Sequence, residues 1–150
     1  MEIVKYLVTL FFLVFVLEAN DIIVKESHCS VDETVQNIKT ILKKKGLGIF
    51  GVINHQGNAK MVDMKLNASK MIIFGKAELG TALMQQDMTV GLDLPLRILV
   101  YRDTDNKVKM AYRDGSWLAK HHILNAEQKV QKVNNVLDKI TTKAGLCKKD

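Results

Sequence analysis

The stretch LRILVYRDTDNKVKMAYR, residues 96–113, decides the fold. Its two halves, residues 96–102 and 107–113, contain β-branched and aromatic side chains, which favour strands. The tetrapeptide between them, Asp103-Thr104-Asp105-Asn106, favours a tight turn, because its side chains can bond to nearby backbone groups. It resembles the start of a calcium loop but lacks the glycine and the distal glutamate of that motif. We therefore predict a β-hairpin and, with it, an antiparallel sheet.

Two amphipathic helices are predicted elsewhere in the sequence, one before this hairpin and one after it. The first begins at Ser30, where Ser30-Val31-Asp32-Glu33 forms a capping box, and it ends near Gly46, a residue suited to a helix C-terminus. Its apolar face is made by Val31, Val35, Ile38 and Leu42. The second helix repeats apolar residues every three or four positions, at Val130, Val133, Leu137, Ile140 and Ala144, before Gly145. Each helix therefore has one face that must pack against another element.

The remaining segments complete a single α+β domain. Residues 21–27, 47–54 and 71–74 are short apolar runs that predict strands, and residues 77–86 predict a short helix. A polar break at residues 55–58 follows the second of these strands. The predicted order is strand, helix, strand, strand, short helix, hairpin, helix. This order favours an antiparallel sheet with both long helices on one face and a cleft between sheet and helix.

The first nineteen residues predict a cleavable signal peptide. Lys5 gives a short positive region, the twelve residues 6–17 carry no charge, and Ala19 supplies a small residue for cleavage. The uncharged run is shorter than the ~20 apolar residues that span a membrane. An uncleaved anchor is the alternative, because Ile3 and Val4 extend the apolar stretch. We expect residues 20–150 to form the mature domain, periplasmic or secreted, without stable membrane insertion.

Cleavage leaves 131 residues with 21 basic and 14 acidic side chains, a formal net charge of +7. This length is enough for one hydrophobic core. A basic surface can attract anionic lipid, an acidic partner or nucleic acid, and export argues against nucleic acid. A solvated lysine surface is the simpler interpretation. No feature of the sequence indicates a particular cofactor, and none determines the oligomeric state.

The two cysteines, Cys29 and Cys147, lie near opposite ends of the mature chain. Disulfides persist in exported proteins, and a bridge here would close a very long loop. Two unpaired thiols are the alternative. Because the sequence has no Cys-x-x-Cys, nothing indicates a redox site or a zinc knuckle.

Familiar catalytic motifs are absent from the sequence. It has no Gly-x-Ser-x-Gly, no His-Glu-x-x-His and no phosphate-binding loop. The four histidines, His28, His55, His121 and His122, do not pair at the spacing that places two ligands on one helical face. The methionines fit flexible core filler better than metal ligands. We therefore predict no metal site.

Residues 74–95, FGKAELGTALMQQDMTVGLDLP, place glycines where the backbone turns or approaches another group closely. Here the sequence resembles the domain of unknown function 302 family, over about residues 22–145. The matching pieces are residues 30–34, the strand ending in His55, Phe74-Gly75, Gly80-Thr81-x-Leu83-Met84, residues 93–96, the hairpin to Tyr112, and Leu118-x-x-His121. The sequence departs from the family at Lys76-Ala77, where the family has Asn-Pro, so no role of that turn is carried over.

The resemblance implies a strand, a helix, four strands and a helix, with the helices gripping an antiparallel sheet. This agrees with the layout predicted from the residues. The family has no settled activity, so the resemblance implies a fold more firmly than a function. His55 and His121 fall on matching positions of the family, and we expect both to lie on one cleft with residues 75–81.

Three functions remain open. The first is an exported, non-enzymatic binding module that holds a small polar or anionic ligand, or a partner, in the cleft between sheet and helix. The second is a small hydrolase-like or isomerase-like enzyme with His55 or His121 as general base and Asp93 as its orienting group. The third is a structural subunit whose Leu83-Met84 segment packs on another chain. The candidate binding residues are His55, Gly75, Gly80, Thr81, Asp93, Tyr112 and His121.

Overall fold

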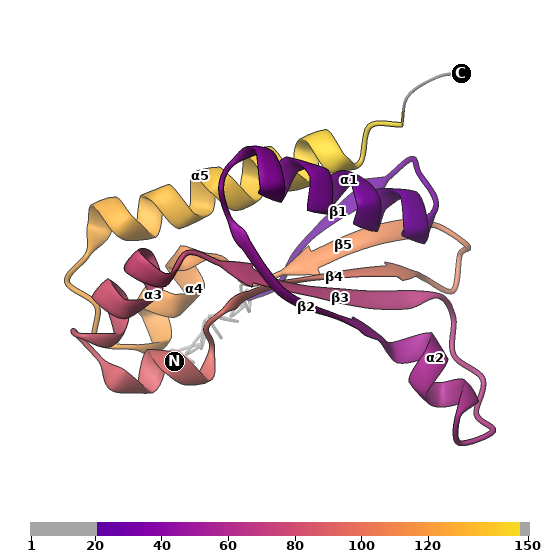
Figure 1. Ribbon diagram of the computed structural model, residues 1–150, viewed down its shortest axis with the longest axis horizontal. Coiled ribbons are helices and arrows are strands. Elements are labelled where there is room, and N and C mark those ends of the chain that lie inside the picture. The colour runs from indigo at the N-terminus through magenta and orange to yellow at the C-terminus, as the bar shows by residue number, and fades with distance from the viewer. Residues whose placement is uncertain (1–20, 148–150) are drawn as a thin grey trace, which may run out of the picture.

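The computed structural model describes residues 21–147, which build one five-stranded antiparallel sheet with helices on one face and at one end (Figure 1). The strand order across the sheet is β1-β5-β4-β3-β2. The elements in chain order are β1 (Ile23–Ser27), α1 (Val31–Lys44), β2 (Gly48–Asn54), α2 (His55–Lys60), β3 (Ser69–Gly75), α3 (Ala77–Met84), the 3-10 helix η1 (Met88–Leu92), β4 (Leu96–Arg102), β5 (Val108–Tyr112), α4 (Gly115–His121) and α5 (Glu127–Ala144). The predicted α+β class is confirmed.

The helix α1 begins where the sequence predicts. The hydroxyl of Ser30 accepts a hydrogen bond from the backbone of Glu33, and the Glu33 carboxylate accepts one from the backbone of Ser30, which completes the capping box. The helix ends before Gly46, whose φ of +64° suits glycine. Both ends of α1 therefore follow from residues that the sequence shows, Ser30 and Glu33 at its start and Gly46 at its end.

The main core lies between the sheet and the two long helices, α1 and α5. Alternate residues of the inner strands point toward the helices, and the helical stripes predicted from the sequence meet them. The large fully buried side chains here are Ile38, Leu42, Ile72, Phe74, Ile98, Val100, Met110, Leu137 and Ile140. The predicted helices on one face of the sheet are thus confirmed, and Figure 1 shows both above it.

A second, smaller core lies at one end of the sheet, where α3, η1 and α4 gather (Figure 1). Leu83 of α3, Val90 of η1 and Leu118 of α4 are buried together. Gly115 brings α4 onto α5, because a Cβ there would lie 2.6 Å from the carbonyl oxygen of Val130. The side chain of Asn134 on α5 accepts the backbone N–H of Gly115 at 2.7 Å and so caps α4.

The structure adds helices that the sequence patterns did not predict. Residues 55–58, expected as a polar break, begin α2, because the side chain of Asn54 accepts the backbone N–H of Gly57. The whole of α4 was not predicted, and α3 ends at Met84 rather than at residue 86. The predicted turn at residues 103–106 is present, with the Asp103 carboxylate accepting the N–H groups of Asp105 and Lys107.

A disulfide joins Cys29, between β1 and α1, to Cys147, after α5, across 118 positions of sequence. The backbone N–H of His28 also donates to the carbonyl of Gly145 at 3.0 Å. The predicted signal peptide lies outside the described residues. Within residues 21–147, none of the helices has the length and apolarity needed to cross a membrane.

Candidate functional site

Two hollows lie at the end of the sheet, and Leu96 at the start of β4 lines both. The first, which we name the α3 hollow, lies between α3 and the adjoining ends of the strands. The second, the sheet hollow, lies on the sheet face that α1 and α5 leave uncovered. Residues 93–96 run between them and contribute to each.

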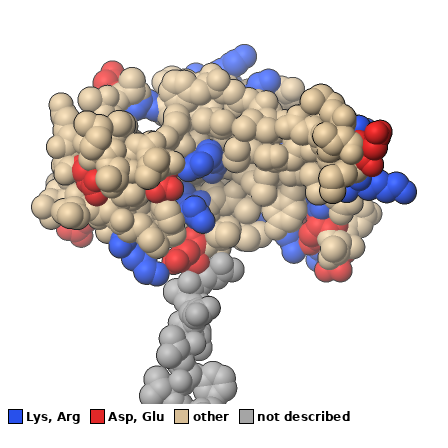
Figure 2. Space-filling view, turned by 90° about the horizontal axis from the view of Figure 1, so that it is seen from below, with Lys and Arg blue, Asp and Glu red and all other residues tan. Residues whose placement is uncertain are grey.

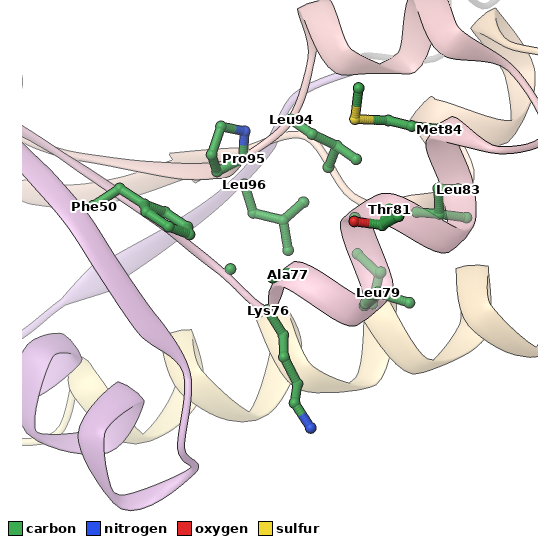
Figure 3. A pocket seen from close by; sticks show the side chains of 13 residues that line it. Phe50, Lys76, Ala77, Leu79, Thr81, Leu83, Met84, Leu94, Pro95 and Leu96 are labelled. Carbon is green, nitrogen blue, oxygen red and sulfur yellow. The ribbon is translucent and has the colours of Figure 1, made fainter.

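The α3 hollow has a volume of about 210 Å³. Figure 3 shows Phe50, Leu94 and Pro95 on one side of it and Leu79, Thr81 and Leu83 of α3 on the other. Two glycines stand where a small side chain would make only ordinary contact with the opposite wall. A Cβ at Gly75 would lie 3.5 Å from the Phe50 ring, and one at Gly80 would lie 3.9 Å from Leu94.

Few polar side chains line the α3 hollow. Its polar side chains are the Thr81 hydroxyl and the Lys76 amine. The amine points away from the apolar walls (Figure 3) and pairs with the Glu78 carboxylate at 3.0 Å. Phe50 is 61% exposed, so its ring is accessible to a ligand in the hollow. The arrangement therefore suits an apolar group and offers little to a polar one.

The sheet hollow has a volume of about 260 Å³. Its floor follows one row of residues that face each other across the strands, Met71 of β3, Leu99 of β4 and Ala111 of β5. Trp117 and Leu118 of α4 form a wall. Figure 2 shows this side of the molecule, largely neutral with Lys and Arg side chains gathered near its middle.

Two arginines line the sheet hollow. The Arg97 guanidinium donates to the backbone carbonyl of Asp93 at 3.2 Å, and its nearest contact with the Asp93 carboxylate is 3.7 Å. The Arg113 guanidinium lies over the Trp117 ring, 4.4 Å from its centroid. Among residues 21–147 Arg113 forms no ion pair with a carboxylate, although its charge contributes, after the hydrogen bond from Lys120, to lowering the pKa of Asp21. The hollow therefore combines an apolar floor with positive charge.

A buried histidine connects η1, α4 and the segment before β4. The Nε2 atom of His122 lies 2.8 Å from the Asp93 carboxylate, and its Nδ1 atom lies 3.2 Å from the hydroxyl of Thr89. The Thr89 hydroxyl is also 2.6 Å from the Asp87 carboxylate. Hydrogen bonds from the Thr89 hydroxyl and from the backbone N–H groups of Ile123 and Thr89 lower the pKa of Asp87 to about 2.

The structure divides the predicted binding residues among separate places. Gly75, Gly80 and Thr81 line the α3 hollow, and Asp93 and Tyr112 line the sheet hollow. His121 is exposed, stacks on Trp117 with ring centroids 4.2 Å apart, and bonds to the Trp117 carbonyl. Its neighbour His122, which is not among the predicted binding residues, is the histidine that contacts Asp93.

His55 does not share a hollow with residues 75–81, which contradicts the expected common cleft. The antiparallel register pairs Gly48 with Gly75 and Asn54 with Lys70, so His55 lies at the opposite end of the β2–β3 pair from Gly75. Figure 1 shows α2, which begins with His55, far from α3. The predicted pairing of His121 with Asp93 is also absent, because Asp93 turns to His122.

Of the Leu83-Met84 segment, Leu83 is not free to pack on another chain, whereas Met84 is partly exposed. Leu83 is 1% exposed and lies in the smaller core with Val90 and Leu118. Sequence reasoning missed other lining residues, chiefly Phe50, Arg97, Arg113 and Trp117. For Arg97 the signal was available, because strict alternation along residues 96–102 places it opposite the buried Ile98.

The sheet, the two covering helices and the hollows define a small α+β domain with room for small molecules at one end. The sequence profile described as "Domain of unknown function DUF302" matches residues 23–142, so the chain belongs to this family. The resemblance found from the sequence is thereby confirmed. A crystal structure described as "uncharacterized conserved protein DUF302 from Bacillus stearothermophilus" superposes with a TM-score of 0.62 at 12% identity, covering 84% of this chain and 94% of that one. This likeness supports the fold.

Curated relatives share more of the sequence. "Fluoride-specific ion channel FluC 1" of Brucella suis biovar 1 (strain 1330) is 38% identical over 105 residues, which cover 70% of this chain and 41% of the relative. The protein of the same name from Brucella abortus biovar 1 (strain 9-941) is also 38% identical, with 39% of its length covered. The chain thus spans about two-fifths of the curated relatives it matches.

Proposed function

We propose that this chain is an exported binding module, periplasmic or secreted, that holds a small apolar ligand in the α3 hollow. The observation that carries the proposal is the lining of this hollow. Its walls come from aliphatic side chains and the exposed ring of Phe50, and its one amine is paired with Glu78. Clefts lined in this way favour apolar ligands, with orientation supplied by a few polar groups such as the Thr81 hydroxyl.

The neutral dye N-phenyl-1-naphthylamine tests this proposal, because its fluorescence rises in apolar surroundings. We expect saturable binding to the wild-type protein. The variant Gly80→Leu extends a side chain from α3 toward Leu94 and should weaken binding about tenfold or more, since close-packed walls exclude the dye. The matched control is Gly80→Ala, whose single methyl group makes ordinary contact with Leu94 and leaves most of the hollow open.

A circular dichroism spectrum of each variant checks that α3 and the sheet are intact. Equal dye affinities for the wild type and a folded Gly80→Leu variant would refute the α3 hollow as the binding site. Absence of saturable binding to the wild type would refute an apolar site of this size altogether.

The fluoride-channel relatives favour a second candidate function, that of a companion to a membrane ion channel. In the two Brucella proteins a region similar to this chain makes up about two-fifths of a polypeptide named as a fluoride-specific channel. Deleting the gene for this chain in its own organism and measuring growth at increasing fluoride concentration tests the idea. Greater fluoride sensitivity, restored by the full chain, is the expected result. Unchanged sensitivity would argue against a role in fluoride handling.

A further inference from the structure

We propose that the sheet hollow is a second binding site, for a small amphipathic anion. The ligand class is an apolar ring or short chain that carries one carboxylate, sulfonate or phosphate group. This site is separate from the α3 hollow and does not depend on what that hollow binds.

The floor of the sheet hollow offers an apolar surface that the apolar part of such a ligand would contact. Met71, Leu99 and Ala111 stand in one cross-strand row on the face that α1 and α5 do not cover. All three are partly exposed, although each belongs to an inner strand of the sheet. With the Trp117 ring as a wall, they offer a flat apolar surface beside a large aromatic ring, and contact with both would remove apolar area from water.

Two arginines of the lining would bind the anionic part of the ligand. Arg97 and Arg113 both line it. Arg113 is exposed, and its guanidinium carbon lies over the Trp117 ring, a cation–π contact that uses none of its five N–H donors. Arg97 uses one donor for the backbone carbonyl of Asp93. Guanidinium groups with free donors bind planar anions through two parallel hydrogen bonds.

The acidic residue in the lining does not cancel this charge. The Asp93 carboxylate is held by His122 at 2.8 Å, nearer than its 3.7 Å contact with Arg97. Two guanidinium groups therefore line the hollow with one carboxylate, Asp93, that is engaged by His122. The Asp21 carboxylate, whose charge also interacts with Arg113, pairs with Lys120 at 2.9 Å. The volume of about 260 Å³ lies just below the usual range for ligand pockets and limits the ligand to a small molecule.

The probe is 8-anilino-1-naphthalenesulfonate, which carries the ring system of the neutral dye named above together with one sulfonate. We expect one saturable site in the wild type. Arg113→Gln and Arg97→Gln should each weaken binding about tenfold, because each removes a charge-assisted hydrogen bond to the sulfonate. Arg113→Lys should retain part of the affinity. Lys60→Gln, the same change of charge on α2 and outside the lining, is the matched control.

The NMR signal of Trp117 can show which hollow the dye occupies, because Trp117 lines the sheet hollow and not the α3 hollow. Trp117 is the one tryptophan in the sequence, so its indole gives one Nε1–H signal in a ¹H–¹⁵N correlation spectrum. We expect the sulfonate dye to shift this signal and the neutral dye to leave it nearly unchanged. Sulfonate binding that is absent in the wild type, or unaffected by both glutamine variants, would overturn the proposal. So would sulfonate binding that Gly80→Leu abolishes, because the dye would then lie in the α3 hollow.

Discussion

His122 and Asp93, 29 positions apart, face each other with the histidine Nε2 atom 2.8 Å from a carboxylate oxygen. The contact joins the residue that follows α4 to the segment that enters β4. The other ring nitrogen reaches Thr89 of η1, so one buried imidazole connects three segments around the smaller core. Residues 93–96 contribute to the lining of both hollows. By contacting Asp93, His122 helps to hold this shared segment in place.

His122→Ala should destabilise the protein by about 1–3 kcal/mol, because it removes two hydrogen bonds from a site where the side chain is 7% exposed. Chemical denaturation followed by circular dichroism measures the free energy of unfolding. The control is His121→Ala on the exposed side of α4, which should change that free energy by much less. Equal effects of the two variants would contradict the role assigned to His122.

Asp87 should make stability depend on acid. Its pKa of about 2 in the folded protein lies below the ordinary value near 3.8, so its carboxylate stabilises the fold above about pH 4 and loses this effect as the pH falls toward 2. Asp87→Asn should therefore lower the melting temperature at neutral pH, and the difference from the wild type should vanish near pH 2. Asp105→Asn, in the exposed hairpin turn, serves as control. A difference that stays constant over this range would show that the charge is not responsible.

Gly115→Ala should destabilise the contact between α4 and α5. Its methyl group would lie 2.6 Å from the Val130 carbonyl oxygen and 2.9 Å from the Asn134 side chain, so one of the two helices must move. We expect a loss of about 1–3 kcal/mol in the free energy of unfolding. Gly80→Ala is a useful comparison, because it meets only an ordinary contact and gives a helical position a better helix former. It should be neutral or stabilising.

The disulfide between Cys29 and Cys147 should contribute strongly to stability. Closing a loop across 118 positions restricts the unfolded chain, and the chain-entropy relation gives about 4–5 kcal/mol. The double variant Cys29→Ser, Cys147→Ser should unfold at markedly lower denaturant concentration. Mass measurement after alkylation, with and without reductant, tests whether the bond forms in the exported protein. Full alkylation of both thiols without reductant would exclude it.

Processing of the N-terminus is a prediction from the sequence alone. We expect the exported protein to begin at Asn20, because the uncharged run ends at Leu17 and Ala19 is the small residue nearest to it. N-terminal sequencing of protein recovered from the periplasm or medium gives the answer. Met1 still present on protein in the membrane fraction would instead support the anchor.

Local patterns were sufficient for the elements that form the main core. The stripe of apolar residues on α5 and the capping box of α1 act within one helix, so periodicity and capping rules predicted both. The N-terminus of α4 is capped locally by the Asp114 side chain, which accepts the backbone N–H of Trp117, and also by Asn134, 19 positions after Gly115. The local cap was therefore present in the sequence, but the seven residues of α4 are too few to show a helical periodicity.

The candidate site was harder to predict. Glycines near α3 pointed to the α3 hollow, and Gly75, Gly80 and Thr81 do line it. The choice between His121 and His122 depends on which way the chain turns after α4, and adjacent positions in a sequence carry no such information. Phe50 lies at a register shift in β2, which lets an apolar side chain of an edge strand face outward.

The disulfide between Cys29 and Cys147 also determines the path of a mechanical force that is applied to the two ends of the chain. A pull applied to the two ends of the chain runs through β1 to Cys29 and then crosses directly to Cys147. The segment between these cysteines is a closed covalent ring that bears none of the load. Both hollows are built almost entirely from that ring. In a domain tethered by its ends and stretched, the covalent chain around the α3 hollow would therefore stay unloaded, whereas the pull would act on β1 and on Ile22, which lines the sheet hollow.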